Sequence, residues 1–213
     1  MKRDDLIEQM VSEATSRKRV SPAFLLVIST GIALALTVAL SYVFASPAEA
    51  AGSRFDAVFL VKCTFVLSVM CGALSIVRDL STPGRQVKWH TALIGVPFVV
   101  MLALTIKELA VEHPSGLQHD LSHASLITCL WQVALLAVPT FVALSIVVRM
   151  LAPVNLARTG LYVGLLSGAI GAFGYAFHCH ENYLTVVAAY YTLAIVQMGI
   201  LGAVLGPRLL RWT

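Results

Sequence analysis

The chain has 213 residues and a net charge of +4, with 58% of its residues hydrophobic and only 12% charged. A soluble globular domain carries about 25% charged residues, so this chain cannot cover a water-facing surface and its solvent must be lipid. The basic residues are scattered between apolar runs and form no single patch, which argues against direct nucleic-acid binding.

Residues 1–22 form a polar head before the first apolar run. Its acidic residues come first and its apolar residues recur with helical period: Asp4, Asp5, Leu6, Ile7, Met10 and Val11. Such an amphipathic helix either lies on the membrane surface, with the basic end 17–19 on lipid headgroups, or docks its apolar face into the groove of a partner protein. The residues alone leave both interpretations open.

Six apolar stretches follow, each close to the roughly 20 residues needed to cross about 30 Å of hydrocarbon. The predicted spans are about 23–45, 57–77, 89–106, 125–148, 159–177 and 183–205. The remaining residues are too few for a separate soluble domain, so we divide the chain into the head 1–22 and a transmembrane domain 23–213. The predicted fold class is all-α: a polytopic membrane protein of six transmembrane helices with cytoplasmic N- and C-termini.

The positions of the basic residues predict this orientation. With the N-terminus inside, the inner segments hold 12 of the 15 lysines and arginines, the outer loops hold 2, and Lys62 lies within a span. Cytoplasmic loops carry an excess of lysine and arginine, so this placement agrees with the positive-inside rule and with an even number of spans. The expected location is the bacterial inner membrane, crossed several times.

Several residues within the spans carry structural expectations. Small residues three or four apart let helices approach closely in lipid, and the fifth span has such a series: Gly160, Gly164, Gly168, Gly171 and Gly174. The series predicts close packing between the fifth and sixth spans, and the alternative is an interface that moves. Pro97 and Pro139 each remove one helical hydrogen bond and predict kinks. Lys62 lies near the outer end of its span, and we expect its ammonium group to extend outward to the interface.

The outer face gathers the residues with the most chemistry. Five of the six histidines lie in or beside the outer loops, and Cys179 lies between the last two: His113, His119, His123, His178 and His180. The possible metal ligands among them are His119, His123, His178 and His180. Cys129 is about one turn into the fourth span from the same side. Thiol and imidazole groups together suit soft metals, and two thiols suit oxidation to a disulfide. The alternative interpretation is that the cysteines are inert small hydrophobic residues and the histidines ordinary loop residues.

Enzymatic motifs are absent from the sequence. It holds no Walker loop, no GxSxG, no HExxH and no dinucleotide-binding fingerprint, and its four cysteines show no CxxC or zinc-finger spacing. An enzyme is therefore not predicted, and no constitutive cofactor is expected. A small metal-ion transporter or an assembly protein of a membrane complex remain alternatives; metal accumulation and co-purification, respectively, would identify them.

The sequence resembles the NrsF family of six-span inner-membrane proteins that act as anti-sigma factors for extracytoplasmic-function sigma factors. The similar features are the opening Asp4–Ile7, Cys129 in the fourth span, the glycine-rich fifth span that runs into Tyr175–Cys179, and the ending Gly206–Trp212. The resemblance covers nearly the whole chain, and its most specific parts are Gly171–Cys179 and the C-terminal end.

The resemblance implies a function that composition does not. The cytoplasmic parts, including the head residues 4–11, would hold an extracytoplasmic-function sigma factor at the membrane, and a signal outside would release it. Cys129 and Cys179 would be the sensing pair for heavy-metal or oxidative stress, with a heavy-metal ion bound only transiently. The partners implied are the sigma factor and the lipid bilayer, and the oligomeric state is not implied.

Overall fold

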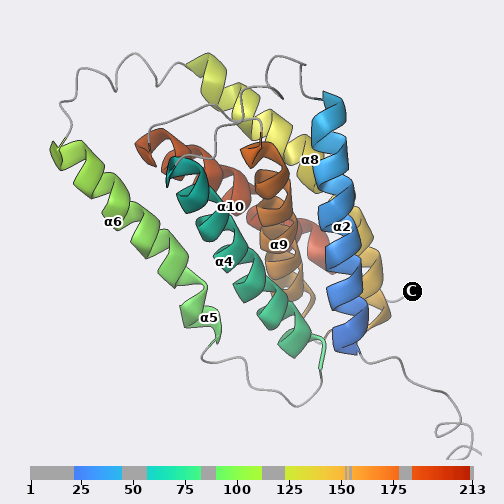
Figure 1. Cartoon of the computed structure of the whole chain (residues 1–213). Helices are drawn as coiled ribbons and strands as arrows, with labels where there is room; N and C mark the ends of the chain where they lie inside the picture. The colour runs from blue at the N-terminus through green and yellow to red at the C-terminus, as the bar shows by residue number, and fades with distance from the viewer. Residues whose placement is uncertain are drawn as a thin grey trace, which may run out of the picture.

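The computed structural model of the chain is a bundle of helices (Figure 1). It describes residues 22–44, 57–82, 90–111, 123–151, 153, 155–177 and 184–211. Its helices, in chain order, are α2 (Pro22–Phe44), α4 (Ala57–Leu80), α5 (His90–Leu93), α6 (Gly95–Val111), α8 (His123–Met150), α9 (Leu156–Ala176) and α10 (Leu184–Leu209). The predicted all-α class is therefore confirmed for the described part of the chain.

Five of these helices are long and apolar enough to cross a membrane: α2, α4, α8, α9 and α10. Their outward faces carry large apolar side chains in contact with the surroundings, such as Phe24, Val43 and Val204. Water-soluble proteins rarely expose contiguous apolar surface of this extent. The chain is therefore a helical membrane protein.

Helix α9 occupies the centre of the bundle, with α2, α4, α8 and α10 around it (Figure 1). The share of its 18-residue apolar window that is buried is 61%, against at most 44% in the other four spanning helices. It begins at an N-cap, because the Asn155 side chain accepts a hydrogen bond from the Arg158 backbone N–H at 3.1 Å. The most buried helix is thus also the one richest in glycine.

The glycine series of α9 is divided among three neighbours. Gly160, Gly164 and Gly168 face α10, where an added Cβ would overlap the backbone or side chains of residues 195–206. Gly171 faces α8, where a Cβ would lie 2.8 Å from the Val133 carbonyl oxygen. Gly174 faces α2, where an added Cβ would lie 2.8 Å from the Thr37 methyl carbon. The packing predicted between the fifth and sixth spans is therefore confirmed for the first three glycines, whereas Gly171 and Gly174 contact other helices.

The third predicted span is interrupted. Helix α5 ends at Leu93, and α6 begins at Gly95 after a turn at Ile94. Pro97 explains the break, because its ring has no N–H to offer the Leu93 carbonyl four residues earlier and clashes with it. Helix α6 then continues to Val111, five residues beyond the predicted end of the span.

A polar contact in the apolar interior joins α2 to α8. The Thr37 and Thr140 hydroxyl oxygens lie 3.0 Å apart, and both side chains are buried. Such an interhelical hydrogen bond has no competing water inside a bilayer, yet measured values average only about 0.6 kcal/mol. The rest of α2 has a largely exposed apolar face. The Thr37–Thr140 contact and the close approach of Gly174 to Thr37 therefore set the position of α2 along α8 and α9.

We expect Thr37→Val to lower the free energy of unfolding by about 0.5–1 kcal/mol, because it removes this interhelical bond and leaves the Thr140 hydroxyl with a weaker partner. Unfolding of the purified protein in mixed micelles would measure the change. Thr30→Val is the matched control, since the Thr30 hydroxyl donates only to the Leu26 carbonyl of its own helix at 2.7 Å. Equal losses in the two variants would contradict an interhelical role for Thr37.

Candidate functional site

Cys129 is buried inside the bundle. Its side chain is 3% exposed, and it belongs to a cluster of buried apolar residues contributed by α4, α6, α8, α9 and α10. We call this the Cys129 cluster; its buried members include Phe65, Val66, Met101, Val133, Ala172, Ala176, Ala188, Tyr190 and Tyr191. A reagent that reaches this thiol must therefore first loosen the helices around it.

The end of α9 lies at the same end of the bundle as Cys129. Helices α8 and α9 are joined by a short connection and run antiparallel. The contact between Gly171 and Val133 sets their position along one another. Cys129 lies one turn before Val133 along α8, and Ala176, in the last turn of α9, belongs to the Cys129 cluster. The described part of α9 ends at Phe177, and Cys179, two residues later, lies outside the described residues.

Aromatic side chains surround this end of the bundle. The rings of Phe59 and Phe177 meet edge to face with centroids 5.6 Å apart, and those of Phe173 and Phe177 at 5.3 Å. Trp131, two residues after Cys129, is 68% exposed on the outside of α8. An outward-facing indole is typical of the membrane–water interface, so its position is consistent with a shallow depth for Cys129.

Lys62 is buried within the bundle. Its side chain is 3% exposed and lies on the same face of α4 as Phe65, Val66 and Val69, which is the face that packs into the bundle. The extension of its ammonium group toward the outer interface stays a prediction. The neighbouring contact of Phe59 with Phe177 places this face against the carbonyl end of α9, where a cation is favourable.

A carboxylate clamp joins α6 to α10 and was missed from the sequence. One carboxylate oxygen of Glu108 accepts hydrogen bonds from the Thr185 backbone N–H at 2.6 Å and from the Thr185 hydroxyl at 2.7 Å. Thr185 is the second residue of α10, so the clamp satisfies one of the unpaired N–H groups at that helix start. Lys107 and Glu108 resemble the beginning of an outer loop, which is why the sequence placed them outside the span.

The predicted metal-binding residues lie almost entirely beyond the described structure. His119, His178, His180 and Cys179 are outside the described residues, and His123 begins α8 with its side chain undescribed. Among the side chains that are described, no group of three His, Cys, Asp or Glu residues could hold a metal ion. Cys63 is half-buried and Cys71 is exposed. The metal prediction therefore stays a prediction, as do the sigma-binding residues in the head.

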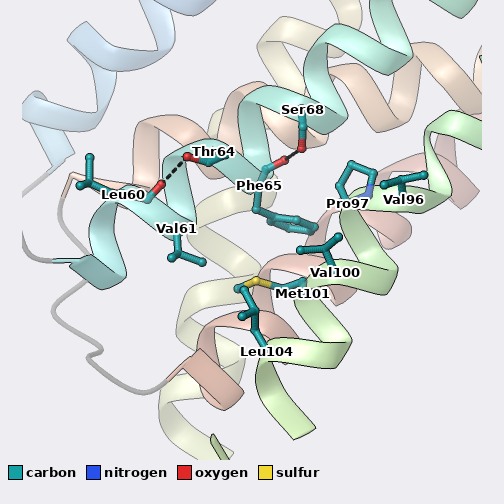
Figure 2. Close-up of a pocket in the computed structure, with 10 residues that line it drawn as sticks. All are labelled: Leu60, Val61, Thr64, Phe65, Ser68, Val96, Pro97, Val100, Met101 and Leu104. Atoms are coloured by element: carbon teal, nitrogen blue, oxygen red, sulfur yellow. Dashed lines mark hydrogen bonds between the residues drawn. The ribbon is translucent and has the colours of Figure 1, made fainter. Parts of the chain in front are cut away.

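A groove between α4 and α6 is lined by apolar side chains (Figure 2). It has a volume of about 390 Å³ and includes Leu60, Phe65, Val100 and Met101. Its two hydroxyl groups are occupied by their own helix, because Thr64 donates to the Leu60 carbonyl at 2.7 Å and Ser68 to the Phe65 carbonyl at 2.6 Å. Such a lining offers no group for acid–base or nucleophilic chemistry.

Comparisons with known proteins give a consistent result. The family model of NrsF, described as negative regulator of sigma F, matches residues 10–212. A probable anti-sigma-F factor NrsF from Azospira oryzae is 29% identical over 154 residues, which is 72% of each chain. The anti-sigma-F factor NrsF from Caulobacter vibrioides is 28% identical over 219 residues, covering both chains completely. No solved structure matches the chain.

Proposed function

This chain belongs to the NrsF family, and from that membership we propose that it is a membrane-bound anti-sigma factor. The observation that carries the proposal is the family match over residues 10–212, because it includes every described helix. Both relatives named above are called anti-sigma-F factors. The family is regulatory, so the chain is not an enzyme, in agreement with the absence of catalytic motifs in its sequence.

The proposed topology is six spans in the inner membrane with both termini in the cytoplasm. Residues 90–111, taken as one interrupted helix, are long enough to cross about 30 Å of hydrocarbon at about 1.5 Å per residue. We therefore count α5 and α6 together as one span, the third along the chain, which brings the total to six. A further support is that α4, α8 and α10 each carry an arginine in the last turn: Arg78, Arg149 and Arg208.

Those three arginines lie at one end of the bundle. Helix α10 runs antiparallel to α9, since Gly160 near the start of α9 meets Gly202 and Gly206 near the end of α10. Helix α8 also runs antiparallel to α9, and α4 begins beside Phe177 at the end of α9. The arginine end is therefore opposite the Cys129 end. The positive-inside rule then favours the arginine end as cytoplasmic and the Cys129 end as periplasmic.

The proposed partner is an extracytoplasmic-function sigma factor held by the cytoplasmic head. Residues 4–11 combine acidic and apolar side chains at helical spacing, which suits insertion into a groove of a partner protein. The head is 22 residues long and too short to form a core of its own, so binding would order it at an entropic cost. The head and the transmembrane domain 23–213 are thus proposed as the two functional parts of the chain.

Deletion of residues 2–20 tests this proposal. We expect the shortened protein to reach the membrane but to lose the sigma factor, since the docking surface is gone while the apolar spans remain. Expression of a reporter gene from a sigma-dependent promoter should rise about tenfold or more, and the sigma factor should no longer co-purify in detergent. A variant with Arg17, Lys18 and Arg19 changed to glutamine is the control for simple loss of lipid-headgroup binding.

One outcome would count against the role of the head, and another against the anti-sigma function as a whole. Full repression by the shortened protein would show that other cytoplasmic segments hold the sigma factor. Failure of the full-length chain to retain any sigma factor, together with capture of respiratory or envelope subunits, would replace the regulator by an assembly protein.

The proposed signal acts at the periplasmic end. Cys129 is buried at that end, and Cys179 follows the last described residue of α9 by two positions. We propose that heavy metal or oxidant modifies this pair, with His178, His180, His119 and His123 as candidate additional ligands.

A further inference from the structure

We propose that Glu108 is a positioning residue whose clamp on α10 keeps the Cys129 thiol shielded from reagents. The inference deepens the proposed function, in which Cys129 is a sensing thiol, and it concerns the regulation of access to that thiol. It rests on described residues only: the two hydrogen bonds of Glu108, the buried cluster around Cys129, and the groove that separates α6 from α4.

The clamp is chemically strong for its location. A single carboxylate oxygen of Glu108 accepts both the backbone N–H and the hydroxyl of Thr185, at 2.6 and 2.7 Å. Hydrogen bonds to an ionised group are shorter and stronger than neutral ones. The start of a helix also carries partial positive charge, which favours a carboxylate there. Glu108 therefore does for α10 what an N-cap residue does within its own helix, but it does so from another helix.

The position of the clamp links it to Cys129. Ala188, one turn after Thr185 along α10, belongs to the Cys129 cluster together with Tyr190 and Tyr191. On the other side of the clamp, Met101 lies about two turns before Glu108 on α6, is 2% exposed, and belongs to the same cluster. The two helices joined by Glu108 thus both contribute buried side chains to the cluster that contains Cys129.

Helix α6 has limited support elsewhere. On its α4 side the apolar groove of about 390 Å³ separates the two helices over the stretch that includes Val96, Val100 and Leu104 (Figure 2). Within the same stretch, Phe98 contacts Phe65 edge to face with ring centroids 5.4 Å apart. The break at Ile94 makes the lower end of α6 a natural pivot. Loss of the clamp should therefore let the upper part of α6 move away from α10 and uncover the cluster.

Thiol labelling in membranes tests the inference directly. Cys63, Cys71 and Cys179 are replaced by alanine, so that Cys129 is the single thiol, and membranes are prepared from cells that lack the sigma factor. The rate of labelling by N-ethylmaleimide is then compared between Glu108 and Glu108→Ala. We expect Glu108→Ala to raise the rate about tenfold, since losing hydrogen bonds to a charged group shifts a local opening equilibrium by about that factor.

Graded variants and a second thiol separate the clamp from general damage. Glu108→Gln keeps an acceptor oxygen and should raise the rate about threefold, while Thr185→Val keeps the backbone bond and should have a smaller effect. Lys107→Ala, which changes an exposed charge next to Glu108, should leave the rate unchanged. In a matching protein whose single thiol is Cys71, which is exposed on α4, Glu108→Ala should not change labelling.

Either of two results would overturn the inference: equal labelling of Cys129 with and without Glu108, or a parallel rise at Cys71, which would indicate loss of the fold. Because the assay contains no sigma factor, it can succeed even if the chain proves to hold another partner. Conversely, the chain can act as a normal anti-sigma factor while Glu108→Ala leaves the labelling of Cys129 unchanged. In that case only the inference about Glu108 fails.

Discussion

Replacing Gly164 by valine should prevent α9 and α10 from pairing and should largely abolish accumulation of the folded protein. A Cβ atom at Gly164 would overlap the Met198 carbonyl oxygen, which is backbone and cannot rotate away. Overpacking a core by ordinary side-chain contacts costs about 1–3 kcal/mol, and a clash with the backbone of a neighbouring helix should exceed that range. Stability in mixed micelles and the amount of protein in the membrane would both measure the loss.

Gly31→Val is the matched control for Gly164→Val. Gly31 lies in the middle of α2, and a Cβ there would have no neighbour within 4 Å. The same substitution in open space should therefore change stability by less than about 1 kcal/mol, because glycine has no packing role there and is itself a poor helix former. If both variants accumulate equally, close backbone packing between α9 and α10 does not stabilise this fold.

The glycine contacts agree in part with the packing expected from the sequence. The sequence predicted that the glycines of the fifth span pack against the sixth span. In the structure, three of the five glycines face α10, and only Gly171 faces α8. The prediction is therefore confirmed for Gly160, Gly164 and Gly168. The contacts of Gly171 with α8 and of Gly174 with α2 were not predicted, because spacing alone does not tell which further helices pack against α9.

The helices themselves were readily predicted from the sequence. Apolar runs of about 20 residues identify spanning helices because an unpaired backbone is costly in lipid, and the observed helices start within three residues of the predicted spans, counting α5 as the start of the third. The third span was the least well predicted. Pro97 signalled a kink, and the structure breaks the span at Ile94, three residues before it. The extension to Val111 was not predicted, because the contact of Glu108 with α10 cannot be read from the sequence.

The contacts of charged residues in and near the spans were harder to predict from the sequence. Lys62 and Glu108 were both assigned to the water-facing side, since an isolated charge in hydrocarbon is expensive. Glu108 instead contacts the start of α10, and Lys62 is buried within the bundle. Helix ends supply partial charges that are invisible in sequence until the partner helix is known. Cys129 was placed correctly near one end of its span because its distance from that end needs only the helix rise.

The double variant Cys129→Ser, Cys179→Ser should hold the sigma factor normally but should no longer release it. Serine is close to cysteine in size, so the buried position of Cys129 can accept it without a cavity. A hydroxyl forms no disulfide and is a poor ligand for soft metal ions, so neither an oxidant nor a heavy metal can modify the pair. Reporter expression from a sigma-dependent promoter, with and without a cadmium salt or diamide, would measure the response.

We expect an induction of about tenfold in the natural protein to fall below about twofold in the double variant, with uninduced expression unchanged. The matched control is Cys63→Ser with Cys71→Ser, which removes the same number of thiols from α4, where Cys63 is half-buried and Cys71 exposed. That control should induce normally. A signal can shift the equilibrium between holding and releasing only through a difference in its interaction with the two states. Normal induction of the Cys129/Cys179 variant would therefore mean that the signal binds elsewhere, even if the chain remains an anti-sigma factor.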